Sequence, residues 1–232
     1  MQRACAIVFY EVIVMAHFMD TVHAPLFEGI PPEERITMLS CFGYYLGSYQ
    51  KGEPVAMEGS YIRHFGIVLS GSIDMVKEDI WGNRTLLVRA KKDDVFGESF
   101  ACGEDKLSSV GFYANEESSV LFLSFDKVMH NCQNACQCHR KITDNMVRVI
   151  AAKNRELMRK VEVVSKRTIR EKVLTYLSLQ AQSQNSRYVE LPLGRLELAE
   201  YLCVDRSALT RELAKMQEEG IIDYDKNCFR IL

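Results

Sequence analysis

The distribution of glycine and proline divides the 232-residue chain into parts that are built differently. Turn-forming residues interrupt the sequence every few positions from about Tyr44 to Asp126, whereas residues 127–191 contain neither glycine nor proline. Frequent turns limit each element to a few residues and favour strands, and a long stretch without these residues favours helices. We therefore predict a β-domain followed by a helical region.

Six short segments rich in apolar residues lie between the turns: "YYLGSYQ", "PVAMEG", "FGIVLSGSIDMVKED", "RTLLVRA", "SSVGFYAN" and "SVLFLSF". Short strands at this spacing predict an all-β sandwich or barrel. The pair "IDMVKEDIWGNRTLLVRA" predicts a hairpin, because Gly82 and Asn83 at its tip can adopt positive φ.

The helical region carries an apolar stripe with the spacing of a helix that pairs with another helix. Ile150, Leu157, Val161 and Val164 follow intervals of about 3.5 residues, which predicts a long helix ending near Val164. We predict a homodimer interface in which a polar residue fixes the register, formed by Ile150, Asn154, Leu157 and Val161. The alternatives are a stripe that packs on the chain's own β-domain and an Asn154 that faces water.

A second apolar stripe precedes the first and is slightly out of phase with it. It consists of Ile142, Met146 and Val149, and a stutter in the heptad pattern explains the offset. The segment "SKRTIREKVLTYLSLQAQ" then predicts another helix, with Ser165 as N-cap. Its predicted buried side is formed by Ile169, Val173, Leu174 and Leu177.

The segment "RLELAEYLCVDRSALTRELAKMQEEG" has the pattern of a helix-turn-helix. The predicted apolar side of its first helix consists of Leu196, Ala199 and Leu202. Cys203-Val204-Asp205 forms the turn, Asp205 caps the second helix, and Gly220 ends it.

The second helix of this motif has two distinct sides. Leu209, Leu213 and Met216 share one side, and the predicted DNA-contacting residues on the other are Arg206, Ser207, Thr210 and Arg211. Arginine can bind guanine O6 and N7 in the major groove, and hydroxyls can reach bases or phosphates. The alternative is an ordinary solvated face. The final segment, "IIDYDKNCFRIL", predicts a two-stranded wing whose tip residue, Lys226, contacts phosphate.

The charge distribution supports a division of roles. Residues 1–138 contain 11 Lys and Arg against 18 Asp and Glu, a net charge of −7, whereas residues 139–232 contain 18 against 13, a net charge of +5. The overall net charge of −2 therefore conceals a basic C-terminal part. A polyanionic partner such as double-stranded DNA is expected there.

The chain resembles the Crp/Fnr family of bacterial transcription regulators. The resemblance rests on three blocks in family order and spacing: "YQKGEPVAMEGSYIRHFGIVLSGSIDMV", "GNRTLLVRAKKDDVFGE" and "LAEYLCVDRSALTRELAKMQEEGIID". It implies an α+β chain with an N-terminal double-stranded β-helix of the jelly-roll, cyclic nucleotide-binding-like type, a long dimerisation helix and a C-terminal winged helix-turn-helix. The expected segments are an N-terminal extension (1–20), the sensor domain (21–127), the hinge and dimerisation helix (128–165) and the DNA-binding domain (166–232).

The resemblance also assigns roles in DNA recognition. Arg206 and Arg211 match the family's two recurrent recognition-helix arginines, whereas Ser207 replaces the Glu of many members. We therefore expect a palindromic target whose half-site differs from theirs. RNA polymerase is a further partner that the family implies.

In the sensor domain, "FGESF" matches the start of the family's phosphate cassette, and Glu98 matches the residue that binds ribose in members that bind cAMP. The expected effector pocket comprises Gly97, Glu98, Ser99, Ser108 and Ser109. The Arg-Ser pair that holds the cyclic phosphate is replaced by Ser108-Ser109, and Lys106 can substitute only in a rearranged loop. A buried phosphate without its arginine is poorly compensated, so cAMP is not the expected effector.

The segment "NCQNACQCHR" suggests a possible ligand cluster. On a helix, Cys132, Cys136 and His139 would lie within one face, at about 0°, 40° and 340°. Thiolates and imidazole suit zinc, an iron–sulfur cluster or haem, with a fourth ligand from Cys102, Cys41 or a second subunit. This predicts an alternative function as a thiol or metal sensor. The simpler interpretation, which we favour, is that these are small buried side chains. The oxygen sensors of the family use clustered N-terminal cysteines that this chain lacks.

Other functional classes fit the sequence less well. Eight irregularly spaced cysteines and the lack of a convincing export signal predict reduced thiols in the cytoplasm, with no membrane association. The one candidate export signal is the segment "CAIVFYEVIVMAHF", which Glu11 interrupts. An equal alternative is that translation starts at Met15 or Met19. A cupin-type enzyme would need several metal ligands, but the strand region offers only His64. A signalling adaptor would lack the DNA-binding motif.

Overall fold

The computed structural model describes residues 22–82, 84–129 and 137–232, apart from the side chains of Ser40 and Gln137. This part of the chain divides into two compact units that meet between Ala151 and Ala152. The division falls within the long helix α5 (Gln137–Val164). These are the N-terminal unit and the C-terminal unit.

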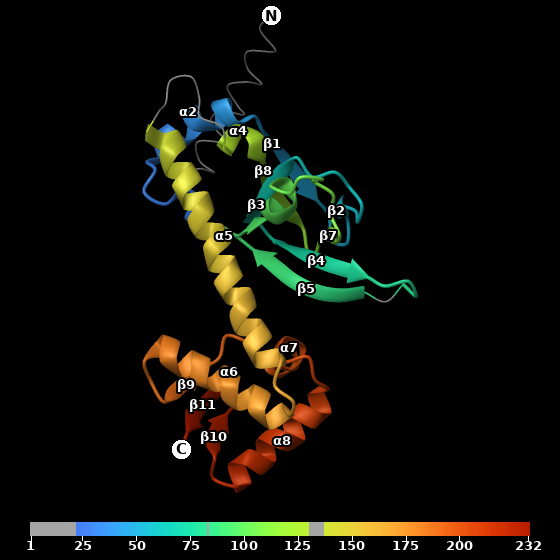
Figure 1. The fold of residues 1–232 in the computed structure, drawn as a ribbon, viewed down its shortest axis with the longest axis vertical. Helices are drawn as coiled ribbons and strands as arrows, with labels where there is room; N and C mark the ends of the chain where they lie inside the picture. Colours follow the sequence, from blue (N-terminus) through green and yellow to red (C-terminus); the bar gives the residue numbers. More distant parts are fainter. Residues whose placement is uncertain (1–21, 83, 130–136) are drawn as a thin grey trace, which may run out of the picture. The chain divides into compact units, whose positions relative to one another are not determined.

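The N-terminal unit contains two four-stranded antiparallel sheets (Figure 1). The first has the order β1 (Tyr44–Tyr49), β8 (Ser118–Ser124), β3 (His64–Ser70) and β6 (Val95–Phe96). The second has the order β2 (Pro54–Ala56), β7 (Gly111–Ala114), β4 (Ser72–Glu78) and β5 (Arg84–Lys91). Strands far apart in sequence are paired, as in β1 with β8. The predicted β-sandwich is therefore confirmed.

The predicted hairpin is formed by β4 and β5, with Glu78 opposite Arg84. Gly82 has a φ of 81°, a conformation that glycine adopts without strain. The prediction for Gly82 is therefore confirmed, whereas Asn83 lies outside the described residues.

The central strand β3 explains how the unit builds two cores. Its side chains alternate between the sheet faces, and residues on both faces are buried. Phe65, Ile67 and Leu69 belong to one cluster, and Val68 belongs to a second cluster that contains aromatic residues of both sheets. The first cluster also includes residues of helices that lie on this outer face: η1 (Pro25–Phe27), α2 (Pro32–Phe42), α4 (Phe125–Met129) and the first half of α5. The sequence patterns did not predict η1 or α2.

Helix α5 uses two different apolar stripes. Ile142, Met146 and Val149 are buried in the first cluster of the N-terminal unit. Ile150, Leu157 and Val161 lie about 75° further round the helix, and they are 38%, 55% and 62% exposed. The explanation of one seam with a stutter is therefore wrong, because the earlier stripe packs on the chain's own strands and the later one does not.

The C-terminal unit combines the second half of α5 and three further helices with a small antiparallel sheet of order β10, β11, β9. Its elements are α6 (Ile169–Gln184), β9 (Tyr188–Glu190), α7 (Arg195–Tyr201), α8 (Arg206–Glu218), β10 (Ile222–Asp225) and β11 (Cys228–Ile231). A single largely aliphatic cluster joins the helices to the sheet. The predicted helix-turn-helix and wing are confirmed.

Two local predictions in this unit are corrected. Helix α6 is capped by Thr168 rather than Ser165: the Thr168 hydroxyl accepts a hydrogen bond from the Glu171 N–H at 3.1 Å, and the Glu171 carboxylate accepts one from the Thr168 N–H at 3.1 Å. This reciprocal capping box satisfies two N–H groups, whereas a serine alone satisfies one. In α7, Leu196 is 54% exposed and Leu198 is buried in its place.

Candidate DNA interface and effector site

Helix α8 begins at a well-formed cap. Asp205 has extended backbone geometry, and its carboxylate accepts a hydrogen bond from the Ala208 N–H at 2.8 Å. Gly220, with a φ of 69°, follows the end of the helix. Both predictions for these residues are confirmed, and the cap fixes where the first turn of α8 begins.

The two sides of α8 are sharply different. Leu209, Leu213 and Met216 are completely buried in the core of the C-terminal unit. The opposite side exposes all four predicted DNA-contacting residues of the helix: Arg206, Ser207, Thr210 and Arg211. The core therefore fixes the rotation of the helix about its axis, and this rotation turns the four polar side chains toward solvent.

The polar face of α8 keeps its positive charge. The Thr210 hydroxyl donates to the Arg206 carbonyl at 2.9 Å, and Arg211 Nε donates to the Ser207 carbonyl at 3.4 Å. Within the described chain, neither Arg206 nor Arg211 has a carboxylate partner. Both guanidinium groups are therefore free to bind an anion or a base edge.

The turn between α7 and α8 is tightly held. Cys203 adopts a φ of 53°, and the N–H of Val204 donates to the Ala199 carbonyl at 3.0 Å. Lys172 of α6 donates to the Leu202 carbonyl at 3.0 Å, which satisfies a carbonyl at the end of α7. Helix α6 thus supports the turn that sets the angle between the two helices of the motif.

Arg170 links α6 to α8 through two carboxylates. It donates to Glu212 at 2.7 Å and to Glu219 at 2.6 Å. These hydrogen bonds raise the pKa of Arg170 and lower the pKa of Glu219. Two carboxylates at α8 are thereby paired with a cation, which reduces their repulsion of a polyanion.

The wing is anchored by a residue that the sequence patterns did not single out. The guanidinium of Arg195 lies over the rings of Tyr224 and Phe229, at 5.1 and 5.7 Å from their centroids, and donates to the Lys226 carbonyl at 3.4 Å. Lys226 has a φ of 50° and an exposed side chain at the tip between β10 and β11. Aromatic residues on both wing strands were the available signal for an arginine that stacks on them.

The predicted effector residues surround the short helix α3 (Glu98–Ala101) and the loop before β7. Gly97 has a φ of 78° and precedes the buried Glu98, whose carboxylate accepts from the exposed Ser99 at 3.5 Å. Ser108 is buried, and its hydroxyl donates to the Val110 carbonyl at 2.7 Å. Ser109 is exposed. The serine in the position of the family's phosphate-binding arginine is therefore turned toward its own backbone.

Two lysines near the expected effector pocket are engaged with other groups of the N-terminal unit. Lys106, the possible substitute, forms a salt bridge with Asp126 at 2.7 Å. Lys77 donates to the Ser109 carbonyl at 2.9 Å and pairs with Glu58. Both of these lysines are thus engaged in this structure.

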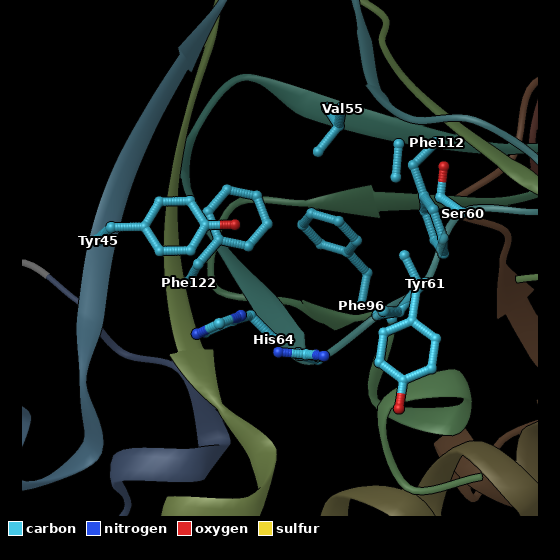
Figure 2. A pocket seen from close by; sticks show the side chains of 12 residues that line it. Tyr45, Val55, Ser60, Tyr61, His64, Phe96, Phe112 and Phe122 are labelled. Atoms are coloured by element: carbon cyan, nitrogen blue, oxygen red, sulfur yellow. The ribbon is translucent and has the colours of Figure 1, made fainter. Parts of the chain in front are cut away.

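A cavity of about 520 Å³ lies beside Gly97 in the N-terminal unit (Figure 2). Aromatic side chains from several strands line it, among them Tyr45, Phe96, Phe112 and Phe122. Of the five predicted effector residues, only Gly97 contributes to its wall. The sequence patterns did not identify the remaining lining residues, because the strands that carry them are distant in sequence.

The candidate metal ligands are only partly visible. Cys132 and Cys136 lie outside the described residues, so their proposed role is not tested. His139 is buried, with Nε2 at 2.9 Å from the Lys127 carbonyl and its ring edge-on to Phe42 at 4.7 Å. Cys41 and Cys102 are exposed. Within residues 22–82, 84–129 and 137–232, no group of three His, Cys, Asp or Glu side chains has the arrangement of a metal site.

None of the helices in the described ranges is both long enough and apolar enough to span a membrane. Helix α5 has the length, but charged residues occur along it.

Comparison with known proteins agrees with this architecture. A model of the cyclic nucleotide-binding domain matches residues 46–134, and a model of the Crp-like helix-turn-helix domain matches residues 171–232. The cyclic AMP receptor protein of Thermus thermophilus is 25% identical over 202 residues, which cover 86% of this chain and 88% of that protein.

Solved structures show the same fold. CprK complexed with OCPA has a TM-score of 0.64 at 17% identity, covering 86% of this chain and 91% of CprK. A CooA variant from Carboxydothermus hydrogenoformans has a TM-score of 0.59 at 16% identity, covering 84% and 85%. With both domain models in the expected order, the chain belongs to the Crp/Fnr family of transcription regulators and carries that family's DNA-binding helix-turn-helix.

Proposed function

We propose that this regulator binds a palindromic DNA site as a homodimer, with Arg206 and Arg211 of each α8 in successive major grooves. The observation that supports this most directly is the exposed face of α8, which presents two hydroxyls and two arginines that have no carboxylate partner among the described residues, on a capped and buried scaffold. Lys226 at the wing tip would add a phosphate contact. RNA polymerase is the expected protein partner by family membership, and the cytoplasm is the expected compartment.

The exposed stripe of α5 supports dimerisation. Ile150, Leu157 and Val161 have no partner within the described chain that buries them, and the polar Asn154 lies within the same stripe. Pairing with the same stripe of a second copy would remove this apolar surface from water. Two-fold symmetry of the protein then requires a palindromic site.

The first test measures the contacts of α8. A duplex that binds well is selected from a random library, and affinities for it and for a scrambled duplex are measured by fluorescence anisotropy. Arg206→Ala and Arg211→Ala should each lose roughly 1–3 kcal/mol on the selected duplex only, whereas Lys226→Ala should weaken both duplexes alike.

Lys92→Ala is the control, because it removes one exposed positive charge from the N-terminal unit. It should leave both affinities nearly unchanged. Equal losses on selected and scrambled DNA for Arg206, Arg211 and Lys226 variants would contradict the assignment of base contacts to α8.

The second test measures the dimer interface. Leu157→Lys should shift sedimentation of the protein from dimer to monomer, because it places charge in an apolar seam. Ala152→Lys introduces the same charge at an exposed position about 140° from Leu157 on the same helix and should remain dimeric. A monomeric wild-type protein at all concentrations, or equal behaviour of the two variants, would overturn the interface.

We further propose that an effector other than cAMP controls this regulator. The support is the paired state of Lys106 and Lys77 and the inward turn of the Ser108 hydroxyl. Titration of the full chain with cAMP should show no binding. Binding of cAMP that depends on Glu98 would contradict this part of the proposal.

A further inference from the structure

The end of helix α5 is built into the core of the C-terminal unit. Val163 is completely buried in the cluster that also contains residues of α6, α7 and α8. Only four residues, Ser165 to Thr168, separate α5 from α6. Within this link the Ser165 N–H donates to the Val161 carbonyl at 2.9 Å, and the Ser165 hydroxyl donates to the Glu162 carbonyl at 3.0 Å. The last turn of α5 is therefore attached firmly to the start of α6.

A second attachment joins the end of α5 to α7, the first helix of the helix-turn-helix motif (Figure 1). The Nζ atom of Lys160 lies over the ring of Tyr201, 5.6 Å from its centroid. The Tyr201 ring also packs on the Tyr176 ring of α6, with centroids 4.8 Å apart and planes inclined by 48°. An ammonium group is attracted by the negative charge on the face of an aromatic ring. Lys160 and Tyr201 thus form the α5–α7 contact.

The surroundings of Tyr201 keep its ring neutral. Burial and Glu156 raise the pKa of the Tyr201 phenol, against the opposing effect of Arg159. Burial and Tyr201 raise the pKa of Tyr176 to about 12. Both phenols therefore stay protonated near neutral pH, and the α5–α7 contact joins the Lys160 cation to a neutral ring. Phenylalanine in place of Tyr201 would preserve such a contact, whereas leucine would remove it.

The two attachments together fix the direction of α5 within the C-terminal unit. A helix that is attached at one point can swivel, whereas a helix that is attached at two points cannot. The short link holds α5 to α6, and the α5–α7 contact holds it to α7. Because α7 and α8 share one core, this contact relates the direction of α5 to that of the DNA-contacting face of α8.

The side of α5 that carries the proposed dimer interface lies apart from its buried side. Leu157 and Val161 are exposed, and the buried Val163 lies about 120° and 160° from them round the helix. Lys160 lies between the two sides, about 60° from both Leu157 and Val163. All of these residues belong to the C-terminal unit, together with α8. One compact unit therefore carries part of the dimer stripe, the α5–α7 contact and the DNA-contacting helix.

We propose that the α5–α7 contact sets the separation of the two α8 helices in the dimer. Lys160 and Tyr201 are then positioning residues, which determine the length of the spacer between the two DNA half-sites. This inference rests on the proposed function, because it requires two copies on one palindromic duplex. One inserted base pair moves the half-sites apart by about 3.4 Å and rotates one against the other by about 35°. A dimer with the contact intact must break it to follow this shift, whereas a dimer without it need not.

The test measures spacer selectivity by fluorescence anisotropy. Affinities are measured for the selected palindrome, for the same half-sites with one base pair inserted into or removed from the spacer, and for a single half-site. Spacer selectivity is the ratio of the affinity for the selected palindrome to the affinity for an altered one. The wild type should prefer the selected spacer. Lys160→Gln should lower this selectivity by about two- to fivefold, which corresponds to one cation–π contact.

Conservative variants distinguish positioning from a general loss of charge. Lys160→Arg keeps a cation and Tyr201→Phe keeps the ring, so both should retain the spacer selectivity of the wild type. Arg155→Gln is the matched control, because it removes one positive charge from an exposed position of α5 about 140° from Lys160. It should leave the selectivity unchanged.

A double variant tests whether the two residues act as one contact. Tyr201→Leu should lower the selectivity as Lys160→Gln does, and combining the two should lower it no further. Thermal melting verifies that the Tyr201 variants fold. Should Tyr201→Leu unfold, the comparison of Lys160→Gln with Lys160→Arg and Arg155→Gln still decides the result.

Three results overturn the inference alone: the same selectivity in Lys160→Gln and the wild type, the same loss in Lys160→Arg and Lys160→Gln, or a monomeric Lys160→Gln in sedimentation. The last result would place Lys160 in the dimer interface instead. The wild-type measurements decide the proposed function. An affinity for the palindrome no higher than for a single half-site would overturn that function, and this inference with it.

Discussion

The two units of this regulator place their candidate sites on very different supports. In the C-terminal unit, four of the five predicted DNA-contacting residues lie on one 13-residue helix, α8. In the N-terminal unit, the cavity is assembled from strands that are distant in sequence, including β1, β6, β7 and β8. A site on one helix depends on a cap and a buried stripe, whereas a site between strands depends on the register of every pair. A site on one helix is therefore less sensitive to substitutions elsewhere in the chain than a site between strands.

The cores of the two units differ accordingly. The C-terminal core is largely aliphatic and joins α6, α7, α8 and the wing in one cluster. The second core of the N-terminal unit contains Phe96, Phe112 and Phe122, whose rings also face the cavity. The C-terminal core mainly supports the exposed face of α8, whereas the second core of the N-terminal unit also forms part of the cavity wall.

The largest expected effect tests whether the two cores are independent. Leu213 is completely buried in the C-terminal unit, so Leu213→Ala should destabilise that unit by roughly 2–5 kcal/mol. Hydrogen exchange measured by mass spectrometry should show faster exchange in residues 166–232 and unchanged exchange in the strands of the N-terminal unit. Faster exchange in both would contradict the comparison, because it would show a single cooperative fold.

A smaller effect sharpens the claim that the DNA-contacting face depends on the cap of α8. Asp205→Ala removes the hydrogen bond to the Ala208 N–H, and it should cost about 0.5–2 kcal/mol of stability and weaken binding to the selected DNA. Denaturation curves and anisotropy measure the two effects. Asp205→Asn keeps a capping oxygen and should retain most of both properties. Equal losses in the two variants would mean that the negative charge matters rather than the cap.

The smallest expected effect is a pH dependence of the link between α6 and α8. Hydrogen bonding from Arg170 lowers the pKa of Glu219 from its usual value of about 4.5. A carboxyl with a lowered pKa in the folded state stabilises the fold above that usual value, and the stabilisation is lost as the pH falls through the lowered pKa.

Glu219→Gln should therefore unfold at lower urea concentration than the wild type at pH 7, and the difference should shrink at pH 3. Glu218→Gln is the control, because Glu218 is exposed on the same helix without an ion pair in the described residues. A difference that is the same at both pH values would contradict the role of Glu219.

The sequence by itself determined the features that depend on neighbouring residues. The Gly and Pro pattern predicted the strands of the sandwich, and helical spacing separated Leu209, Leu213 and Met216 from the polar face of α8. Asp205 and Gly220 marked the ends of that helix because capping is a local property of the backbone. The prediction of Ser165 as the N-cap of α6 was wrong, because the capping box of Thr168 and Glu171 satisfies more N–H groups than a serine alone.

Only the tertiary structure decided which surfaces find partners. The helical pattern of Ile142, Met146 and Val149 does not show that they pack on the chain's own strands while Ile150, Leu157 and Val161 remain exposed. The cavity likewise depends on register: Gly66 lies opposite both Phe96 and Phe122, and a Cβ at Gly66 would collide with the Phe96 ring. Such pairings join residues tens of positions apart, and no short-range pattern in the sequence encodes the distance between them.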